Sequence, residues 1–358
     1  MSDPQKHLLH IFPTFAVGGS QMRFAQLARL HGARYRHTVI ALDGKTDMAA
    51  RLQGLPVTCH ELAYDKRKPL DSFRRFRDAL RTLRPDVLLT YNWGAIEWAL
   101  INRLEGLARH IHIEDGFGPE EAQNQLRRRI WLRRLALSGK NTTIVLPSRN
   151  LERIARDIWS LPQNRVRFIS NGVDCARFAA REREGKAGGL VIGTVASLRR
   201  EKNIGRLIRA FATIAADREA ELLIVGGGEE RQGLEQLARE LRLGGKVRFA
   251  GQSDRPEDWY PQMDIFALSS DTEQMPLGVL EAMAAGLPVV STDVGDVAQM
   301  VSAKNRDYVV PANAFAAALA RLLGDQTARH AIGQANEKKA RESFDEDVMA
   351  GSYAELIG

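Results

Sequence analysis

Two glutamates eight positions apart, Glu273 and Glu281, are the residues whose types and spacing most suggest chemistry. Glu273 follows an apolar run in a polar loop, whereas Glu281 lies among the apolar residues of a predicted helix. A carboxylate in an apolar setting needs a polar partner, because burying an unpaired charge is costly. A ribose diol would suit Glu281 as a bidentate acceptor, and the hydroxyls of a sugar ring would suit Glu273.

The residues between the two glutamates, Met275, Pro276 and Leu277, lead into that predicted helix. Backbone N–H groups in a first helical turn have no partner within the helix, so they suit a phosphate group. A further strand end, residues 291–296, carries a glycine turn and is expected to line the base or sugar pocket. These segments together predict a sugar-nucleotide site in the second half of the chain.

Cations stand at an earlier strand end, in the segment Arg199-Arg200-Glu201-Lys202. A departing diphosphate gains negative charge, and cations placed there would balance it. We expect Arg199 and Lys202 to bind the diphosphate, with Arg200 as the alternative to Arg199.

Three glycines, Gly226, Gly227 and Gly228, follow the next predicted strand. They allow a ligand to approach the backbone closely, and they equally allow a tight turn with positive φ. The chain has no G-x-G-x-x-G or P-loop pattern, which disfavours dehydrogenases and ATPases.

The elements that must position these groups repeat along the chain, as short apolar runs that alternate with amphipathic helical stretches. Such runs are typical of parallel strands buried on both faces. The predicted strands of the first half are 8–12, 37–42, 55–60, 86–91, 111–113 and 143–146, and those of the second half are 190–195, 221–225, 247–250, 265–268 and 288–291. The sequence thus predicts an α/β protein with two doubly wound Rossmann-like domains facing across a cleft.

The composition is that of an ordinary globular protein, with 358 residues, 44% of them hydrophobic and 27% charged. Its two cysteines, Cys59 and Cys175, are far apart and have no C-x-x-C or histidine partners, so we expect free thiols in a reducing compartment. No apolar run approaches the ~20 residues of a spanning helix, and no signal peptide is visible. These features predict a cytoplasmic protein.

Positive charge is concentrated in the first half: residues 1–165 hold 27 Lys and Arg against 16 Asp and Glu, whereas the remainder holds 24 against 28. In the densest basic segment, 127–135, Ile130, Trp131 and Leu135 would share one helix face flanked by arginines. Such a helix suits an anionic membrane surface, and equally a solvated helix packed on the core. The chain has no zinc-finger, RNP-type or helix-turn-helix pattern, so we expect no nucleic-acid partner.

An acidic run near the end, Asp345-Glu346-Asp347, has the D-x-D spacing of some metal sites. It lies in a predicted helical tail, without a cluster of other oxygen ligands around it. Helix capping is therefore the favoured interpretation, and no metal site is expected.

The chain resembles the family 4 glycosyltransferases in an ordered series of motifs. The series comprises Gly18-Gly19, Asn171-Gly172-Val173-Asp174, Arg199 with Lys202, Gly226-Gly227-Gly228, Glu273 with Glu281, and the run from Pro288 to Gly295. The resemblance is strongest from Asn171 to Arg341, and the Glu-x7-Glu segment is its most specific part. It implies the GT-B fold, a sugar-nucleotide donor, retention of anomeric configuration, and no metal or other cofactor.

Carried over to this chain, the resemblance implies that Glu273 holds the transferred sugar and that Glu281 binds the ribose. The implied contacts to the donor are Gly18, Gly19, Arg199, Lys202, Gly227, and the backbone of Met275, Pro276 and Leu277. The domains are then residues 1–168, onto which the helix 344–358 packs back, and the donor-binding residues 169–343.

Two departures from the family pattern leave alternatives open. Ser197 stands where the family has an arginine, so Arg199 is the expected substitute, with Arg200 still open. Asp115 stands where the family often has a histidine, and we place it among the catalytic groups. The group that faces the acceptor is one of His112, Glu114 and Asp115.

The function implied by this resemblance is retaining transfer of a hexose-type sugar from a UDP- or GDP-linked donor to a glycan or lipid-linked acceptor, in cell-surface polysaccharide assembly. The expected location is the cytoplasm, with peripheral contact to an anionic membrane. The alternatives are a sugar-nucleotide epimerase or hydrolase on the same fold, and a non-catalytic nucleotide-binding protein.

Overall fold

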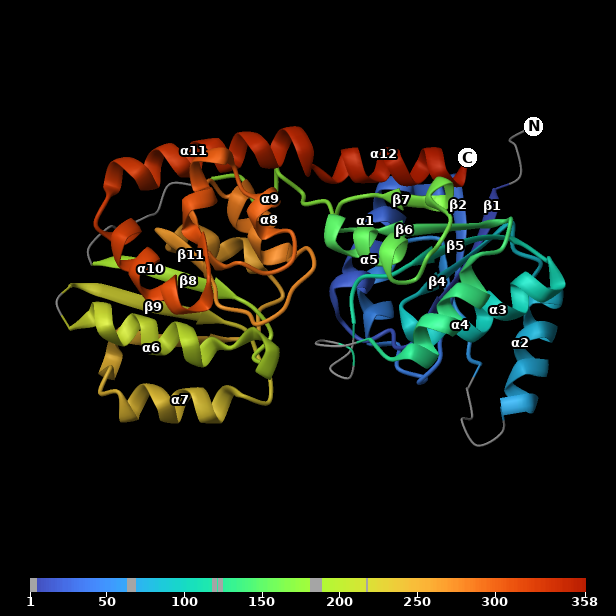
Figure 1. Cartoon of the computed structure of the whole chain (residues 1–358), viewed down its shortest axis with the longest axis horizontal. Helices are drawn as coiled ribbons and strands as arrows, with labels where there is room; N and C mark the ends of the chain where they lie inside the picture. The colour runs from blue at the N-terminus through green and yellow to red at the C-terminus, as the bar shows by residue number, and fades with distance from the viewer. Residues whose placement is uncertain (1–4, 63–68, 118–120, 122–124, 181–188, 217) are drawn as a thin grey trace. The chain divides into compact units, whose positions relative to one another are not determined.

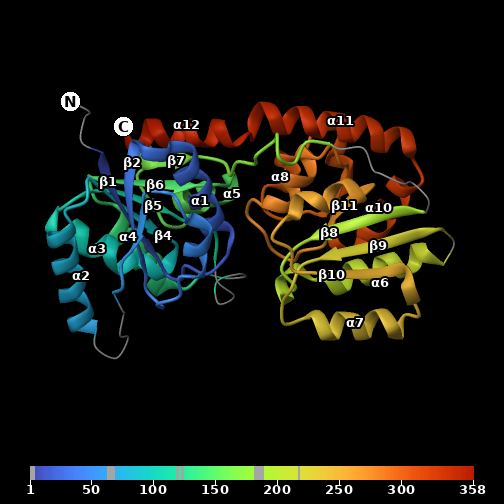
Figure 2. The same ribbon diagram turned by 180° about the vertical axis from the view of Figure 1, so that it is seen from behind.

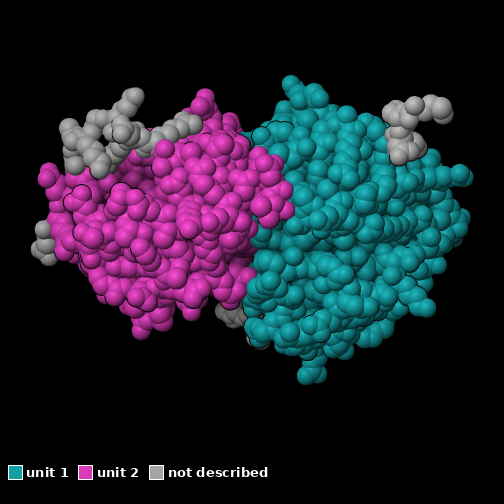
Figure 3. Space-filling model, turned by 90° about the horizontal axis from the view of Figure 1, so that it is seen from above, with its two compact units in different colours: residues 1–171, 349–358 teal, residues 172–348 magenta. Residues whose placement is uncertain are grey.

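The chain folds into two compact units in a computed structural model that describes residues 5–62, 69–117, 121, 125–180, 189–216 and 218–358. The first unit comprises Met1–Asn171 and Met349–Gly358, and the second comprises Gly172–Val348 (Figure 3). The chain therefore passes from the first unit to the second and back, so that residues 349–358 belong to the unit in which the chain begins.

Seven parallel strands form the sheet of the first unit, in the order β3-β2-β1-β4-β5-β6-β7 (Figure 1). Their bounds are β1 Lys6–Phe12, β2 Tyr35–Ala41, β3 Val57–Cys59, β4 Val87–Tyr91, β5 Arg109–Ile113, β6 Thr142–Leu146 and β7 Val166–Phe168. The order reverses between β1 and β4, and ligands of open α/β sheets bind outside the carboxyl ends of the strands near such a reversal. The segments that follow β1, β4 and β5 are therefore the places to look for a site in this unit.

Helices cover both faces of this sheet (Figures 1 and 2). They are α1 Gly19–His31, α2 Pro69–Leu83, α3 Ile96–Glu105, α4 Arg127–Leu137, α5 Arg149–Asp157 and α12 Glu346–Ile357, of which residues 349–357 lie in this unit. Leu8 and Phe12 of β1 pack with α1 and α12, whereas Leu9 and Ile11 pack with α2 and α3. Because both faces are buried, the strands are continuous apolar runs, which is the pattern that the sequence shows.

Six parallel strands form the sheet of the second unit, in the order β10-β9-β8-β11-β12-β13 (Figure 2). The strands are β8 Leu190–Val195, β9 Ala220–Val225, β10 Val247–Gly251, β11 Ile265–Leu268, β12 Val289–Thr292 and β13 Val309–Val310, and the helices are α6 Ile204–Ala215, α7 Arg231–Glu240, α8 Leu277–Ala284, α9 Val297–Met300, α10 Phe315–Leu323 and α11 Gln326–Ser343. The order reverses between β8 and β11. The loops after these two strands, which carry Lys202 and Glu273, therefore meet at one edge of the sheet.

The two parallel sheets confirm the predicted α/β class, and every predicted strand is present. The sequence does not predict the edge strands β7 and β13, because segments of three and two residues carry almost no hydrophobic pattern. The helical tail predicted from Ala314 onward consists of three helices, α10, α11 and α12. Between the last two, Asp345 Oδ1 accepts the N–H of Asp347 at 3.0 Å, so the acidic run caps a helix as expected.

Buried histidines line the sheet of the first unit. His10 on β1 has Nδ1 3.0 Å from the Tyr91 hydroxyl and Nε2 3.0 Å from Nδ1 of His37. His110 on β5 has Nε2 2.8 Å from the hydroxyl of Thr90. Burial lowers the pKa of His37 to about 4 and that of His110 to about 3, and it holds the pKa of His10 well below its ordinary value. These rings are therefore neutral in the folded protein near pH 7.

Candidate active site

The Glu273 carboxylate lies at the carboxyl edge of the second unit's sheet, in the loop after β11. Lys202 Nζ lies 2.6 Å from Glu273 Oε1, and the Ser270 hydroxyl donates to the same oxygen at 2.7 Å. The side chains of Glu273 and Lys202 are 10% and 20% exposed, so the pair is shielded yet still reachable from solvent. The structure thus brings together the carboxylate expected to hold the sugar and the ammonium expected to bind the diphosphate.

Glu281, one turn into α8, forms a short hydrogen bond within the same unit. The fully buried Tyr260 donates its hydroxyl to Glu281 Oε2 at 2.5 Å. Nearby, Arg177 forms an ion pair with Glu257 at 2.8 Å. Burial raises the pKa of Glu281 above its ordinary value, while the hydrogen bond from Tyr260 and the charge of Arg177 oppose that rise. The polar partner that the Glu281 carboxylate needs in its apolar surroundings is therefore Tyr260, and no residue spacing in the sequence indicates this pairing.

The first turn of α8 begins four residues after Glu273 and offers backbone donors. Pro276 occupies the N-cap position without a side-chain cap, and the first turn holds no acidic residue. The side chains of Met275 and Pro276 are buried, and Leu277 packs partly against the same core. With these side chains buried, a ligand would meet backbone here: Pro276 has no N–H, so the donors are the N–H groups of its neighbours, and the partial positive charge of the helix start suits an anion.

The loop after β12 supports the Glu273 loop through Gly295. Gly295 has φ of +54°, and a Cβ added there would lie 2.5 Å from the carbonyl oxygen of Gln274 and 2.6 Å from that of Glu273. The N–H of Asp296 donates to Gln274 O at 2.9 Å. Only glycine fits so close an approach with a left-handed backbone. The segment 291–296, predicted to line the base or sugar pocket, thus holds the Glu273 loop in place.

The three glycines after β9 pack against the loop after β8, which leads to Lys202. A Cβ at Gly226 would overlap the carbonyl oxygen of Ala196, and a Cβ at Gly228 would overlap that of Leu198. The carbonyl oxygen of Gly227 accepts the N–H of Leu198 at 2.8 Å. Of the two interpretations of this segment, tight backbone packing accounts for Gly226 and Gly228. Donor binding by Gly227 stays a prediction.

Arg199 and Arg200 lie in a different environment from Lys202. Together with residues of α6 and α7 they line a cavity of about 620 Å³. Arg199 is 56% exposed, and its Nε donates to the Ser197 hydroxyl at 3.0 Å. Ser197 occupies the position at which the resemblance expects an arginine. Through its hydrogen bond to Ser197, the guanidinium of Arg199 lies close to that position. The preference for Arg199 over Arg200 as a diphosphate ligand remains a prediction.

In the first unit, α1 begins in the segment that follows β1. Gly18 is its N-cap, with an extended backbone and no side-chain cap, and no acidic residue occupies the first turn. Gly19, the first helical residue, is exposed. The N–H groups of this turn suit an anion such as a diphosphate, which is the chemistry expected of Gly18 and Gly19.

Asp115 lies two residues after β5, at the carboxyl edge of the first unit's sheet. Its two oxygens accept from Arg23 on α1 at 2.5 and 2.9 Å, and the same guanidinium donates to Asn171 Oδ1 at 2.9 Å. Asn92, with φ of +57°, accepts the N–H of Asp115 at 2.7 Å. The Asp115 side chain is 21% exposed. A bidentate pair fixes a carboxylate in position, so Asp115 is both held and accessible.

His112 and Glu114, the other two candidates for the acceptor side, are fully buried. Arg133 Nε lies 3.3 Å from Glu114 Oε2, and the same guanidinium lies 3.1 Å from Glu121. His112 Nε2 lies 3.4 Å from Glu114 Oε2. In the structure, Glu114 belongs to a buried ion-pair network around Arg133, because each buried charge there needs a partner, and His112 lies beside it. Asp115 is the accessible residue of the three.

The basic helix α4 divides its arginines between the core and the surface. Arg133 is buried, and Arg134 donates to the backbone carbonyl oxygens of Ile158 and Trp159, just after α5. Ile130 packs against the core, whereas Trp131 is 61% exposed. Arg127 and Arg128 are exposed as well. The prediction that Ile130 and Trp131 share one helix face is therefore wrong. The apolar face of α4 packs against the core and does not include Trp131. In the described part of the chain, no helix combines the length and apolar character needed to span a bilayer.

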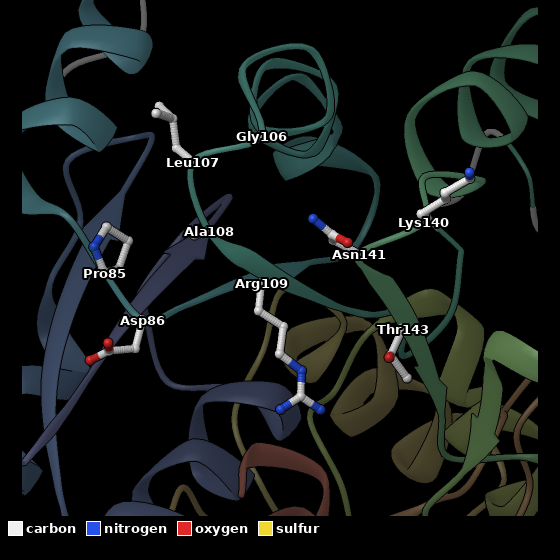
Figure 4. A pocket seen from close by; sticks show the side chains of 9 residues that line it. All are labelled: Pro85, Asp86, Gly106, Leu107, Ala108, Arg109, Lys140, Asn141 and Thr143. Atoms are coloured by element: carbon white, nitrogen blue, oxygen red, sulfur yellow. The ribbon is translucent and has the colours of Figure 1, made fainter.

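A cavity of about 640 Å³ opens at the amino edge of the first unit's sheet, where the segments before β4, β5 and β6 meet (Figure 4). Polar side chains line it, among them Asp86, Arg109, Lys140 and Asn141. Arg109 also donates to the carbonyl oxygen of Ile357 at 3.2 Å, at the end of α12. The candidate site residues lie at the carboxyl edge, where ligands of parallel sheets bind. This cavity at the amino edge is therefore separate from them.

Two family models match the chain in succession. Residues 17–177 match the model described as Glycosyltransferase Family 4, and residues 177–339 match Glycosyl transferases group 1. The N-acetyl-alpha-D-glucosaminyl L-malate synthase of Bacillus anthracis is 28% identical over 162 residues, which are 44% of this chain and 42% of that protein. The lipopolysaccharide core biosynthesis glycosyltransferase LpsE of Rhizobium meliloti is 27% identical over 212 residues, 58% of this chain and 61% of that protein. The matches thus span less than two thirds of either relative.

The fold has a counterpart among solved structures over nearly its whole length. The crystal structure of Anabaena HepE in complex with UDP and glucose matches with a TM-score of 0.82 and covers 98% of each chain. At 18% sequence identity this likeness shows the fold alone, and it confirms the predicted GT-B architecture.

Proposed function

Because the chain belongs to the family 4 glycosyltransferases, we propose that it transfers a hexose-type sugar from a nucleotide diphosphate donor to a glycan or lipid-linked acceptor, with retention of configuration. The observation that carries this proposal is the contact between Lys202 and Glu273, 2.6 Å apart at the carboxyl edge of a parallel sheet. After Glu273 in the chain come the uncapped start of α8, which suits a phosphate group, and the partly exposed Glu281, which suits a ribose.

In the proposed reaction, the bond between the anomeric carbon and the diphosphate oxygen breaks while the acceptor hydroxyl oxygen bonds to the same carbon from the same face. Negative charge grows on the diphosphate, where Lys202, Arg199 and the start of α8 stabilise it. The acceptor's proton passes to the departing phosphate oxygen, so the step needs no covalent nucleophile from the protein. Glu273 accepts hydrogen bonds from the sugar and also holds the Lys202 ammonium in place.

On the acceptor side, we propose that Asp115 accepts a hydrogen bond from an acceptor hydroxyl beside the attacking one, whose own proton passes to the departing phosphate oxygen. It is the accessible carboxylate among the three candidates, and Arg23 holds it through two hydrogen bonds. A carboxylate held in one position orients the acceptor molecule for attack, and correct orientation contributes a large part of the rate enhancement in such reactions.

The donor is proposed to be UDP- or GDP-linked, and UDP is the first candidate because HepE was crystallised with UDP. The relative LpsE is named for lipopolysaccharide core biosynthesis, which supports an acceptor in cell-surface polysaccharide assembly.

A comparison of donor consumption with and without an extracted acceptor pool tests the reaction. We expect consumption that depends on the acceptor and is lost in Glu273→Ala, whereas Glu342→Ala, at an exposed position on α11, behaves as wild type. Consumption that never depends on an acceptor would indicate an epimerase or hydrolase. Full cellular function in Glu273→Ala would indicate a non-catalytic nucleotide-binding protein.

We also propose that the exposed surface of α4 contacts anionic membranes. Arg127-Arg128 and Trp131 are exposed there, and a tryptophan beside cations suits the interface of an anionic bilayer. In vesicle flotation we expect binding at low salt that weakens at high salt. Replacing Arg127 and Arg128 by Gln should remove it, whereas the same change at the exposed Arg153 and Arg156 of α5 should not. Equal binding by both double variants would contradict this proposal.

A further inference from the structure

We propose that Tyr260 is a positioning residue that orients the Glu281 carboxylate and holds it in the charged form that binds the donor ribose. The inference rests on the proposed function of this site, since Glu281 is the expected ribose ligand. It concerns a residue that would act through Glu281 rather than by touching the donor.

The ring of Tyr260 is locked by its surroundings. Tyr260 is fully buried, and its ring lies 5.6 Å from that of Phe178, nearly perpendicular, and 5.9 Å from that of Phe266. Its hydroxyl therefore has a fixed direction, toward Glu281 Oε2 at 2.5 Å. A distance this short is typical of a hydroxyl that donates to an ionised carboxylate. One hydrogen bond from Tyr260 leaves Oε1 and a further acceptor site on Oε2 for the hydroxyls of a ribose diol.

The charges around Glu281 make this hydrogen bond important. Burial raises the pKa of Glu281, and Glu257 adds to the rise through its negative charge. Tyr260 and Arg177 oppose it, but Arg177 is already paired with Glu257 at 2.8 Å. Among the described residues, the Tyr260 hydroxyl is thus the one hydrogen-bond donor to the Glu281 carboxylate, and its removal favours the neutral acid, which accepts hydrogen bonds from a ribose less well.

The variant Tyr260→Phe keeps the ring and removes only the hydroxyl. Binding of UDP and of GDP, measured by isothermal titration calorimetry between about pH 5 and 8, gives the readout. A higher pKa for Glu281 means that its charge is lost earlier as the pH falls. We therefore expect affinity below wild type at every pH, because the carboxylate is no longer oriented, and a deficit that grows to about 10-fold or more at the acid end.

Two further variants separate this effect from packing and from titration of the ligand's own phosphate. Glu281→Gln cannot titrate, so the pH dependence that it retains belongs to the ligand, and adding Tyr260→Phe to it should leave that dependence unchanged. Tyr308→Phe removes a hydroxyl from another buried tyrosine of the same unit and should match wild type. Thermal unfolding without nucleotide checks that each variant is folded.

The possible results are distinct. Affinity in Tyr260→Phe that is lowered equally at every pH, or that equals wild type throughout, would overturn the inference while leaving the proposed function intact. A wild-type protein that binds neither UDP nor GDP would refute the proposed function itself.

Discussion

The variant Gly295→Ala tests whether the loop after β12 holds Glu273 in place. An alanine at φ of +54° costs about 1–2 kcal/mol of stability, because L-residues disfavour the left-handed region. Its Cβ would also lie 2.5 and 2.6 Å from the carbonyl oxygens of Gln274 and Glu273, and relieving such overlap typically costs about 1–3 kcal/mol more. The backbone that must move carries Glu273, whose carboxylate lies 2.6 Å from Lys202. A displacement of about 1 Å at reacting groups is enough to lower turnover about 100-fold.

Gly244 provides a matched control in the same unit. Its φ is +52°, and a Cβ there would have nothing within 4 Å, so Gly244→Ala carries the conformational cost without the collision. We expect Gly244→Ala to retain wild-type turnover with a modestly lowered unfolding temperature. Gly295→Ala should unfold lower still, by about 2–4 °C for each additional kcal/mol, and should lose turnover in the acceptor-dependent assay. Equal unfolding temperatures and equal turnover in the two variants would refute the supporting role of Gly295.

Three further predictions concern charge. Lys202→Ala should lower the rate of single-turnover transfer about 10²- to 10³-fold. Wild-type rates in this variant would show that the diphosphate is stabilised by other groups. The control is Lys246→Ala, because among the contacts described the Lys246 Nζ donates only to a backbone carbonyl oxygen. Arg23→Ala removes both hydrogen bonds from Arg23 to the Asp115 carboxylate and should destabilise the protein by about 1–3 kcal/mol in urea unfolding; an unchanged unfolding midpoint would contradict this. Stability should fall as the pH drops from about 6.5 toward 4, because unfolded histidines take up protons at their ordinary pKa while burial lowers the pKa of His37 to about 4. The loss should be about 1 kcal/mol per pH unit for each such ring; His37→Gln should reduce the slope, and a flat profile in urea unfolding would contradict the assignment.

Glu273 and Lys202 could be found from the sequence because of how parallel sheets are built. Each follows a buried apolar run, and the carboxyl ends of such strands meet at the same edge, so residue type and position were enough to assign both to one site, although the contact between them was not predicted. Tyr260 and Ser270 could not be found in this way. Their roles depend on the direction of one hydroxyl in the folded chain, and neither position belongs to a periodic pattern.

The arginines of α4 show a second limit of sequence patterns. In the sequence, Arg127 and Arg133 are equivalent members of one basic run. In the structure, Arg127 is exposed, whereas Arg133 is buried between the rings of Trp93 and Trp159. Glu114 shows the same limit. It was a candidate for the acceptor side, but in the structure its carboxylate forms an ion pair with the buried Arg133. Charge counts cannot separate these cases, because the partners come from elements elsewhere in the chain.

The return of α12 to the first unit constrains the order in which this protein matures on the ribosome. Met349, Tyr353 and Ile357 fill one face of the first unit's core, yet they are translated only after residues 172–348. At 5–20 residues per second, the nascent first sheet waits roughly 10–35 s with that apolar face uncovered. The second unit needs no residue beyond Val348, so its set of strands and helices is complete in the chain before residues 349–358 have been made. The part of the polypeptide made first is therefore the part that finishes folding last.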